Sequence, residues 1–232
     1  GYGVDGGFAD FCVTRSEALH KLPGEVTLEQ GALAEPLAVA VHAVTERADV
    51  SMGDYVLVSG AGTIGVLAAF VAKRAGAFVI LAGTSCDYDR LRIGMEIGAD
   101  MVVNVEDQAL HSVVNDVTAG CGVDVAFECA GNIASITQCV QCLRKQGTLT
   151  QVGLVETQVP VNFDDLSRRE LKLIGSFGHR WVSWEAAVEL LRRFGDVLGN
   201  VISTRHPLEE WETAFEEIES RAALKVLLYP GH

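Results

Sequence analysis

The fold is decided by the stretch Asp54-Tyr55-Val56-Leu57-Val58-Ser59-Gly60-Ala61-Gly62-Thr63-Ile64-Gly65-Val66-Leu67-Ala68-Ala69. A short apolar run rich in β-branched residues ends in three spaced glycines, and an alanine-rich apolar segment follows at once. Dinucleotide binding requires this order of strand, glycine turn and helix, with the phosphates at the positive end of the helix dipole. The glycines permit a sharp turn, close approach of the pyrophosphate, and close packing of the helix on the sheet. The cofactor-binding residues expected here are Gly60, Gly62, Thr63, Ile64 and Gly65.

Strands and helices alternate along the chain after the glycine turn. Short apolar runs predict further strands at 78–82, 101–105, 123–128, 147–152 and 171–176. Segments between them predict helices at 91–97, 110–117 and 133–143. Alternation of this kind is typical of a parallel sheet covered on both faces, and right-handed crossovers favour the doubly wound arrangement. The sequence therefore predicts an α/β protein with a doubly wound, six-stranded parallel Rossmann sheet. A methyl-donor enzyme with a similar strand and turn is the minor alternative.

The two ends of the chain do not continue this alternation. Residues 1–13 have a glycine spacing typical of a β-rich domain and include no initial Met, so we expect the chain to start inside a larger protein. A strand is predicted to end at His20-Lys21-Leu22-Pro23, before a short helix with Thr27 as N-cap and Gln30 completing a capping box. The other predicted elements are a helix from Glu35-Pro36 to about Ala48, helices at 183–194 and 208–219, and a strand at 225–229.

Composition argues against several kinds of partner. The 232 residues carry a formal net charge of −13 with no local concentration of Lys and Arg, so we expect no nucleic-acid partner. No apolar stretch reaches the roughly 20 residues that cross a bilayer, and no signal-peptide pattern opens the chain, so we expect no membrane contact and a cytoplasmic protein. The six cysteines are scattered, and we expect free, mostly buried thiols.

Several segments together resemble one known family. They are Gly6 to Phe11, Lys21 to Pro23, Gly31 to Leu37, Val39 to Ala43, Gly60 to Gly65, Ile97 to Asp100, Glu128 to Gly131, Gly147 to Leu149, Val152-Gly153 and Arg205 to Leu208. In this order they resemble the medium-chain, zinc-containing alcohol dehydrogenases, closest to the sorbitol and threonine dehydrogenase branch. The resemblance implies a full-length oxidoreductase that transfers hydride between a polyol or secondary alcohol and NAD or NADP, with a zinc ion, as a homodimer or tetramer.

The same resemblance divides the chain into three parts. It implies that 1–36 is the tail of a β-rich catalytic domain, that 37–178 is the dinucleotide-binding Rossmann domain, and that 179–232 returns to the catalytic domain. The sequence contains no Gly-His-Glu, the family's zinc-ligand motif, so this chain alone is expected to be inactive. A dinucleotide-binding module without turnover and a zinc-free medium-chain reductase are the alternatives.

Glu35 is the one position at which the resemblance implies a metal role. It would ligate the zinc or hold its water, although a carboxylate at a helix start also has the ordinary effect of favouring the positive dipole end. Glu35-Pro36 favours the zinc-containing branch over the zinc-free reductases. Two interpretations stay open for His42, a member of a proton path or a core residue. His179 and Arg180 either contact the substrate or pack against the following helix.

The nicotinamide half of the cofactor has its own implied contacts. By resemblance, Val39 would touch the nicotinamide ring, and the ribose would lie near Cys129, Ala130 and Gly131. The backbone groups implied at the carboxamide are those of Val152, Gly153, Leu154, Ser176 and Phe177.

The end of the second strand bears on the choice between NAD and NADP. An acidic residue about 20 residues past the glycines binds the ribose 2′-hydroxyl of NAD, whereas small polar residues and an arginine accommodate a 2′-phosphate. Thr84 and Ser85 stand where the acid is expected, and Arg90 is within reach of a phosphate, which favours NADP. Asp87 and Asp89 would repel a phosphate and keep NAD open, unless Asp87 serves as a helix N-cap.

Overall fold

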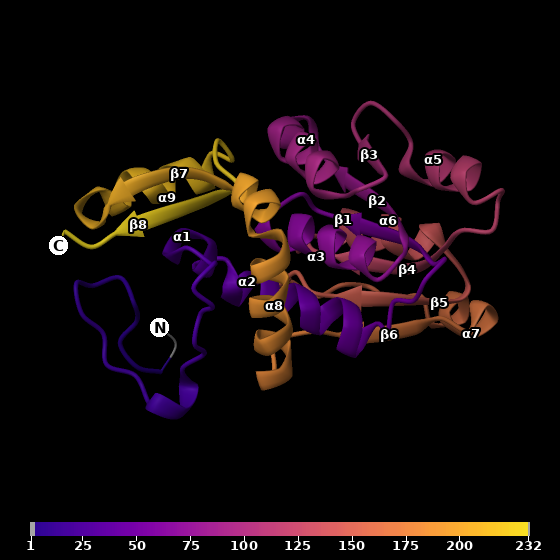
Figure 1. Cartoon of the computed structure of the whole chain (residues 1–232). Coiled ribbons are helices and arrows are strands. Elements are labelled where there is room, and N and C mark those ends of the chain that lie inside the picture. The colour runs from indigo at the N-terminus through magenta and orange to yellow at the C-terminus, as the bar shows by residue number, and fades with distance from the viewer. Residues whose placement is uncertain (1–2, 232) are drawn as a thin grey trace.

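A parallel sheet of six strands is the largest element of the computed structural model, which describes residues 3–231 (Figure 1). Gly1 and Tyr2, at the start of the predicted segment 1–36, lie outside the described residues. The strands are β1 (Tyr55–Ser59), β2 (Phe78–Gly83), β3 (Met101–Asn104), β4 (Val123–Glu128), β5 (Leu143–Gln151) and β6 (Lys172–Gly175). Their order, β3-β2-β1-β4-β5-β6, is the doubly wound order of Rossmann sheets. The predicted fold class is confirmed.

Helices cover both faces of this sheet. Alternate residues of a strand point to opposite faces, so Val56 and Val58 of β1 belong to one core and Leu57 belongs to the other. The first core also includes residues of α2 (Ala34–Val41), α3 (Thr63–Arg74), α4 (Tyr88–Ile97) and α8 (Trp181–Leu198). The second core includes residues of α5 (Leu110–Val117) and α6 (Ile133–Cys142). Apolar residues on both faces are what a parallel sheet buried by two helical layers requires.

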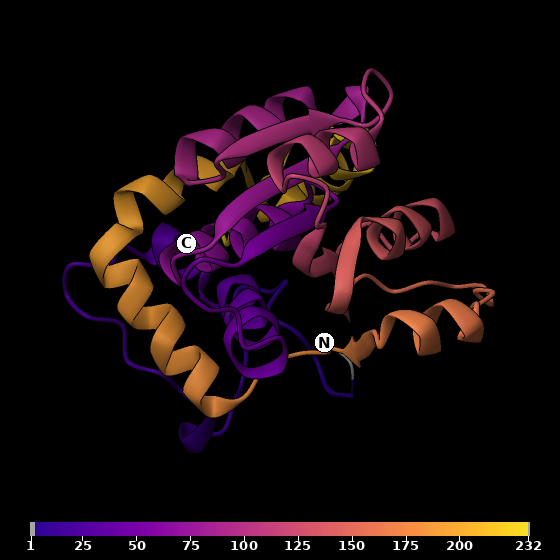
Figure 2. The same ribbon diagram turned by 90° about the vertical axis from the view of Figure 1, so that its right-hand side faces the viewer.

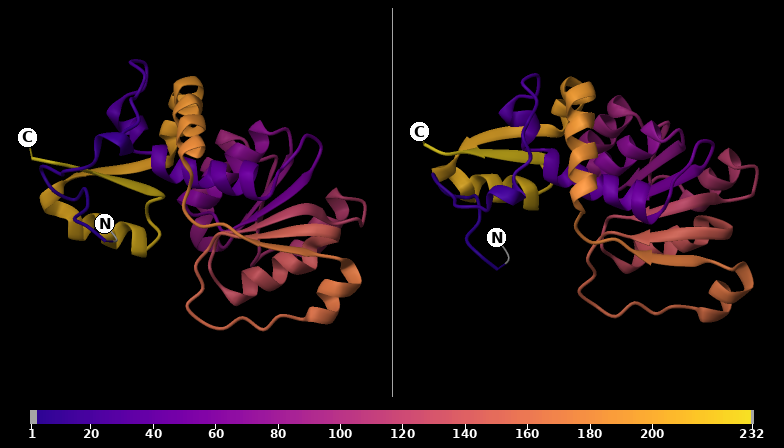
Figure 3. Two further views of the ribbon diagram at one scale, coloured as in Figure 1. Left: turned by 90° about the horizontal axis from the view of Figure 1, so that it is seen from below. Right: turned by 60° about the horizontal axis from the view of Figure 1, so that its bottom comes forward.

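The C-terminal residues form a second, smaller sheet. Strands β7 (Ile202–Pro207) and β8 (Lys225–Tyr229) pair in parallel, and α9 (Trp211–Glu219) lies between them in the chain. Figures 1 and 3 show this yellow unit on the far side of the orange helix α8 from the six-stranded sheet. The second sheet agrees with the expected β-rich remnant at this end, although β7 itself was not predicted because, after Ile202, it continues with four polar residues, Ser203 to His206, and shows no apolar run or alternation.

The N-terminal part of the chain contains helical turns but no strand over residues 3–54. The predicted strand end at His20–Pro23 is therefore wrong: a strand needs a neighbour for its backbone groups, and none is paired with this segment in the described residues. The short helix α1 (Leu28–Gly31) begins as predicted. Thr27 N donates to Gln30 Oε1 at 2.9 Å, and Gln30 N donates to Thr27 Oγ1 at 3.2 Å, which is the expected capping box.

The remaining predicted boundaries hold to within a few residues, with three differences. Helix α2 does not continue as an α-helix to Ala48 but passes into a π-helix at His42–Arg47. Strand β5 begins at Leu143, where the predicted helix still extended. Helix α7 (Phe163–Arg169) was not predicted, and Asn162 begins it by accepting hydrogen bonds from the N–H groups of Asp164 and Asp165. Figure 2 shows α8 running along one side of the molecule.

The cysteines depart in part from expectation. All six are free, and Cys139 and Cys142 are buried in α6, but Cys12, Cys86 and Cys121 are exposed because they lie in loops and turns and not on core-facing strands. No helix within residues 3–231 is long and apolar enough to span a membrane.

Candidate functional site

The three glycines of the turn after β1 serve three different geometries. Gly60 has a φ of +111°, in the left-handed region, and a Cβ there would lie 2.7 Å from Ala130 N. A Cβ on Gly65 would lie 1.9 Å from the Gly60 carbonyl oxygen, so only glycine lets α3 approach this closely. A Cβ on Gly62 would meet nothing within 4 Å. Gly62 is also the N-cap of α3 and supplies no side-chain acceptor, so the first N–H groups of the helix stay available for a ligand.

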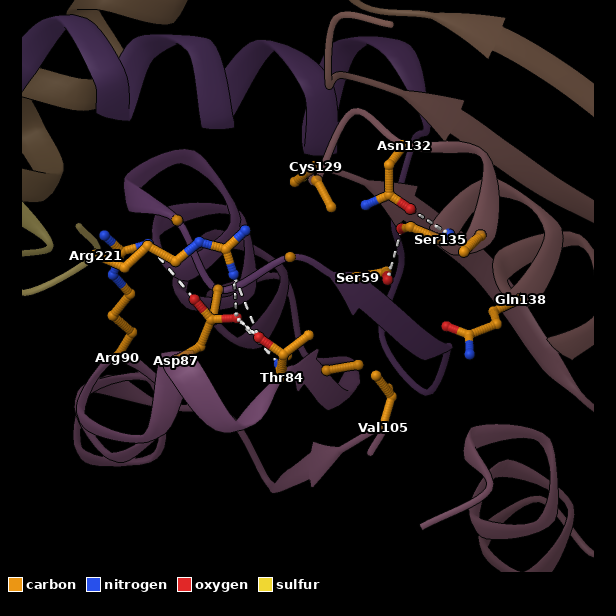
Figure 4. Close-up of a pocket in the computed structure, with 17 residues that line it drawn as sticks. Ser59, Thr84, Asp87, Arg90, Val105, Cys129, Asn132, Ser135, Gln138 and Arg221 are labelled. Atoms are coloured by element: carbon orange, nitrogen blue, oxygen red, sulfur yellow. Dashed lines mark hydrogen bonds and ion pairs between the residues drawn. The ribbon is translucent and has the colours of Figure 1, made fainter. Parts of the chain in front are cut away.

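A cavity of about 310 Å³ lies directly beside this turn (Figure 4). It sits at the carboxyl ends of β1, β2 and β4, where the strand order reverses and where α/β sheets bind ligands. The residues lining it are Ser59, Gly60, Ala61, Gly62, Ala82, Gly83, Thr84, Asp87, Arg90, Val105, Cys129, Ala130, Asn132, Ala134, Ser135, Gln138 and Arg221.

Two arginines meet at the β2 end of this cavity. Arg90 comes from α4, and Arg221 comes from the turn between α9 and β8, with a φ of +62°. Arg221 Nη1 lies 3.3 Å from Thr84 Oγ1 and 3.6 Å from Asp87 Oδ2. Arg90 Nη1 lies 3.5 Å from Asp87 Oδ1, and its Nη2 donates to the Ala223 carbonyl at 2.6 Å. Figure 4 shows both guanidinium groups gathered around Asp87 and Thr84.

The Asp87 carboxylate is directed inward and is already occupied. It is buried, and it accepts hydrogen bonds from Thr84 N at 3.0 Å and from Thr84 Oγ1 at 2.8 Å. In these bonds Asp87 is the third residue of a capping box whose N-cap is Thr84. It stands at the N-cap position of α4 but makes no side-chain cap hydrogen bond there, so it does not act as the N-cap that the sequence suggested. The Asp89 side chain is 80% exposed and faces Arg92, at a distance of 3.8 Å. The other carboxylate near the end of β2 belongs to Glu106, which follows the neighbouring strand β3.

Glu106 follows β3 and contacts the residue after Thr84. Its Oε2 accepts the Ser85 N–H at 3.0 Å. Hydrogen bonds from the Ser85 side chain and backbone lower the pKa of Glu106, and Arg221 lowers it further. Burial lowers the pKa of Arg90, while the charge of Asp87 opposes that effect. Ser85 thus presents its N–H group to a carboxylate of this chain.

The β4 end of the cavity is neutral. Asn132 begins α6 and accepts the Ser135 N–H at 2.9 Å, and Ser135 Oγ donates to Ser59 Oγ at 2.8 Å. Burial, followed by the nearby Glu128 charge, raises the pKa of the Cys129 thiol well above its ordinary value. The raised pKa favours the neutral thiol form of Cys129.

A second cavity of about 540 Å³ shares Asn132 and Ala134 with the first, and two of the predicted nicotinamide-side residues border it. Gly131 and Leu154 line this second cavity. Several of the backbone groups expected at the carboxamide are used internally. Val152 N and Gly153 N donate to the Glu128 carbonyl at 2.9 and 2.8 Å, and Ser176 N donates to the Gln151 carbonyl at 2.9 Å. Phe177 is 74% exposed just beyond β6.

Glu35 lies near a histidine but not in a complete metal site. Its Oε1 lies 3.7 Å from His179 Nε2, and its side chain is 59% exposed. Trp184 Nε1 donates to His179 Nδ1 at 2.8 Å, which orients the other ring nitrogen toward Glu35. Val39 and Ile64 are half-buried, in α2 and α3. Residues 3–231 contain no group of three or more His, Cys, Asp or Glu side chains that could hold a metal ion. Catalytic zinc sites have three protein ligands and structural sites have four, so Glu35 and His179 alone do not form a zinc site.

His42 belongs to a packed polar group. Its Nδ1 lies 3.2 Å from Glu46 Oε2, one turn further along the π-helix, and Ser183 donates to the same carboxylate. Arg180 Nη1 lies 3.2 Å from Glu46 Oε2. These contacts join the π-helix to the start of α8, which favours the packing interpretation for His42 and Arg180.

Three features of the site were missed by sequence reasoning. Arg221 reaches the cavity from the C-terminal segment, and no local pattern indicates that. Glu128 is the last residue of β4, and Asn132 directly precedes α6. The order of strand, short turn and helix in this segment is the sequence signal that could have indicated both residues. Their position resembles that of the glycine turn after β1, because both lie at carboxyl ends of neighbouring strands.

A doubly wound sheet with a glycine turn and a cavity at its switch point defines an α/β protein of the Rossmann type. A model of the family described as zinc-binding dehydrogenase matches residues 63–193, which is more than half of the chain. The chain belongs to this zinc-binding dehydrogenase family.

Two relatives and one solved structure illustrate the similarity. A sorbitol dehydrogenase of Halalkalibacterium halodurans is 36% identical over 97% of this chain and 66% of its own length. A D-arabitol-phosphate dehydrogenase of Enterococcus avium is 32% identical over 97% of this chain and 64% of its own length. A zinc-binding dehydrogenase of Sinorhizobium meliloti, crystallised with NADP, has a TM-score of 0.85 and 29% identity over 97% of this chain and 66% of that one. The chain thus spans about two thirds of the length of the curated relatives it matches.

Proposed function

We propose that this chain is the NAD(P)-binding portion of a dehydrogenase that transfers hydride between a polyol or secondary alcohol and the nicotinamide. The observation that carries the proposal is the space at Gly62: the backbone at the start of α3 is open to a cavity at the switch point of the sheet. When bound, the nicotinamide supplies the hydride chemistry. The chain's own residues, with 37–178 as the dinucleotide-binding domain, hold the phosphates and orient the two halves of the cofactor.

The polar groups at the end of β2 support NADP as the preferred cofactor. A 2′-phosphate there would meet the Thr84 hydroxyl and the Arg221 guanidinium, with Arg90 behind them. Asp87 does not oppose this, because Thr84 and the two arginines already occupy its oxygens. The NADP-bound structural relative is consistent with this preference. NAD is the alternative, favoured by the exposed Glu106, whose carboxylate beside Ser85 is a suitable acceptor for a ribose 2′-hydroxyl.

The roles at the nicotinamide side remain part of the same proposal. Gly131 and Leu154 flank the second cavity. We expect the backbone of the segments 152–154 and 176–177 to contact the carboxamide through groups other than the N–H groups of Val152, Gly153 and Ser176, which are engaged within the chain. Glu35 and His179 would face the substrate side, where Glu35 retains its proposed metal role in the whole protein. The polyol substrate class rests on the names of the relatives.

Strand β6 supports an oligomer, a homodimer or tetramer. It forms one edge of the six-stranded sheet, and Leu173 in it is 47% exposed. An unpaired edge with exposed apolar side chains favours pairing with a second chain. Sedimentation velocity on the wild type and on Leu173→Lys tests this: we expect a dimer or larger species that shifts toward the monomer in the variant.

The central experiment uses Gly62→Ala with Gly199→Ala as its control. Both glycines have room for a Cβ and have negative φ angles, so both variants should fold as the wild type does. Only the Cβ at residue 62 enters the space meant for the pyrophosphate. Calorimetric titration should show NADPH binding to the wild type and to Gly199→Ala, and at least about tenfold weaker binding to Gly62→Ala, which corresponds to about 1.4 kcal/mol. Equal binding to all three proteins would contradict the proposed site.

The titration combined with a turnover assay on the whole protein separates the alternatives. A module without turnover would bind NADPH yet show no reduction of NADP by polyols under any condition of added zinc. A protein that binds neither NADPH nor NADH would contradict the whole proposal.

A further inference from the structure

Glu128 is a fully buried carboxylate that the proposed function does not use. It is the last residue of β4 and has no exposed surface. Its Oε1 accepts the N–H groups of Ala130 and Gly131, both at 2.9 Å. Its Oε2 accepts a hydrogen bond from Gln151 Nε2. All three donors are neutral groups, and two of them are backbone amides of the loop that follows β4.

The same residue also holds the loop that follows β5. Its carbonyl oxygen accepts the N–H groups of Val152 and Gly153, at 2.9 and 2.8 Å. Gln151 Nε2, which contacts the carboxylate, also donates to the Gly153 carbonyl at 2.8 Å. Glu128 therefore joins two loops that are separate in the sequence, 129–131 and 151–154.

These two loops touch each other without room for side chains. A Cβ on Gly153 would lie 2.5 Å from Gly131 N and 2.8 Å from Glu128 Oε2, and a Cβ on Gly131 would lie 2.5 Å from the Leu154 carbonyl. The relative position of the loops is thus set by backbone contact around a single carboxylate. Because interiors cannot leave a buried polar group unpaired without cost, any change in this carboxylate is transmitted to both loops.

The loops border the part of the site away from the β2 end. Cys129 and Ala130 line the first cavity opposite Thr84 and Arg221, and Gly131 and Leu154 line the second. A dinucleotide with its phosphates at Gly62 and its adenosine at the end of β2 would extend its other half toward these loops.

We propose that Glu128 is the positioning residue for the nicotinamide half of the cofactor site, acting by holding the 129–131 and 151–154 loops in register. This assignment rests on the proposed dinucleotide function. Glu128 makes no contact with the cofactor itself; it fixes the backbone that does.

The test compares two ligands that differ in the nicotinamide half. NADPH carries both halves, whereas 2′-phospho-ADP-ribose carries the adenosine half without the nicotinamide. Glu128→Gln keeps the size of the side chain, but its new NH₂ group faces the donor Gln151 Nε2 or the two backbone N–H groups, so one contact becomes a donor–donor clash. We expect NADPH to bind at least about tenfold more weakly to Glu128→Gln, while 2′-phospho-ADP-ribose binds within about twofold of the wild type.

A polarity exchange supplies the rescue. In Glu128→Gln/Gln151→Glu, the amide at 128 can accept from the loop N–H groups with its oxygen and donate to the new carboxylate at 151. NADPH should bind at least about threefold more tightly than to Glu128→Gln, without reaching the wild-type affinity, because the exchange removes the Gln151 Nε2 donor to the Gly153 carbonyl. Asp124→Asn is the matched control. Asp124 lies near the other end of β4 and accepts the Tyr55 N–H at 2.7 Å, so its loss affects stability but neither ligand.

Each outcome is decisive. Equal weakening of both ligands in Glu128→Gln, or no weakening of either, would overturn the assignment by showing a merely structural role or none. If the wild type binds neither NADPH nor 2′-phospho-ADP-ribose, the proposed function is contradicted, and the role of Glu128 with it. If thermal melts show that Glu128→Gln does not fold, Gln151→Ala removes the donor to Oε2 and to the Gly153 carbonyl but leaves both backbone N–H bonds to Oε1, and the same selective loss of NADPH binding is required of it.

Discussion

Arg221 Nη1 lies 3.3 Å from Thr84 Oγ1, although 137 residues separate the two in the sequence. The contact brings a cation from the turn before β8 to the end of β2, inside the cavity that the glycine turn borders. It is the structural basis for our expectation that this site distinguishes a 2′-phosphate from a 2′-hydroxyl.

Replacing Arg221 by Gln should therefore change cofactor preference. A charge-assisted hydrogen bond contributes about 1.5–3 kcal/mol, so NADPH affinity should fall by about tenfold or more. NADH affinity should change by less than about twofold, since NADH has no 2′-phosphate. Calorimetric titration of both cofactors measures the ratio. Arg192→Gln, which removes an exposed arginine paired with Glu189 on α8, is the control and should leave both affinities unchanged. A parallel loss for NADPH and NADH would argue that Arg221 serves the fold and not the phosphate.

Gly65→Ala should destabilise the fold, whereas Gly62→Ala should not. The added Cβ at residue 65 meets the Gly60 carbonyl at 1.9 Å, so α3 must move away from the turn. Overpacking of this kind costs about 1–3 kcal/mol, whereas Gly62→Ala, with open space around its Cβ, should be neutral or slightly stabilising. Urea denaturation of the two variants provides the comparison. Similar midpoints for both would contradict the close approach of α3.

The C-terminal unit should weaken as the pH rises through the titration of His206. Hydrogen bonds to Glu217 and then to Glu210 raise the pKa of His206 above its ordinary value of 6.5. A raised pKa stabilises the fold fully below pH 6.5, and the stabilisation disappears as the pH rises through the folded value. The difference in melting temperature between the wild type and His206→Gln should thus be larger at pH 6 than at pH 9. A difference that does not vary with pH would show that folding does not shift the pKa of His206.

The contact of Glu29 with β7 and β8 should fail in acid. Hydrogen bonds from Arg205 and then from Tyr229 lower the pKa of Glu29 to about 2. A lowered pKa stabilises the fold above the ordinary value of 4.5, and this stabilisation is lost as the pH falls through about 2. In Arg205→Met the pKa of Glu29, followed by carboxyl-carbon NMR, should move back toward 4.5. An unchanged pKa would mean that Arg205 does not govern this carboxylate.

The six-stranded sheet could be predicted from the sequence because the patterns that indicate its strands and turns lie within short segments of the chain. The apolar runs of β1 and β4 and the glycines at 60, 62 and 65 specify strands and a turn through residues that are adjacent in the chain. The order of the strands followed from alternation and from the handedness of crossovers, which are general rules. Those rules contain no information about the particular contacts made at the strand ends.

The parts of the site that escaped prediction depend on contacts between distant segments. Arg221 reaches Thr84 only because the β7–β8 unit lies against the start of α3, where Thr63 Oγ1 donates to the Leu224 carbonyl at 2.6 Å. Likewise, the sequence suggested Asp87 as a helix N-cap, whereas its carboxylate accepts from Thr84 and lies beside Arg221, which comes from the turn before β8. The strand end at His20–Pro23 was wrongly predicted because a local sequence pattern cannot report whether a partner strand lies beside it.

The parallel pair β7–β8 also links the binding of a ligand to the stability of the C-terminal unit. Two strands alone do not make an independently stable sheet, so this unit depends on its attachments to the larger body through Thr63, Arg90 and Glu29. Local opening of this unit requires less free energy than unfolding of the six-stranded sheet, and it withdraws Arg221 from the cavity. A ligand held by Arg221 would oppose that opening by mass action, so bound cofactor would raise the free energy required to detach the C-terminal unit.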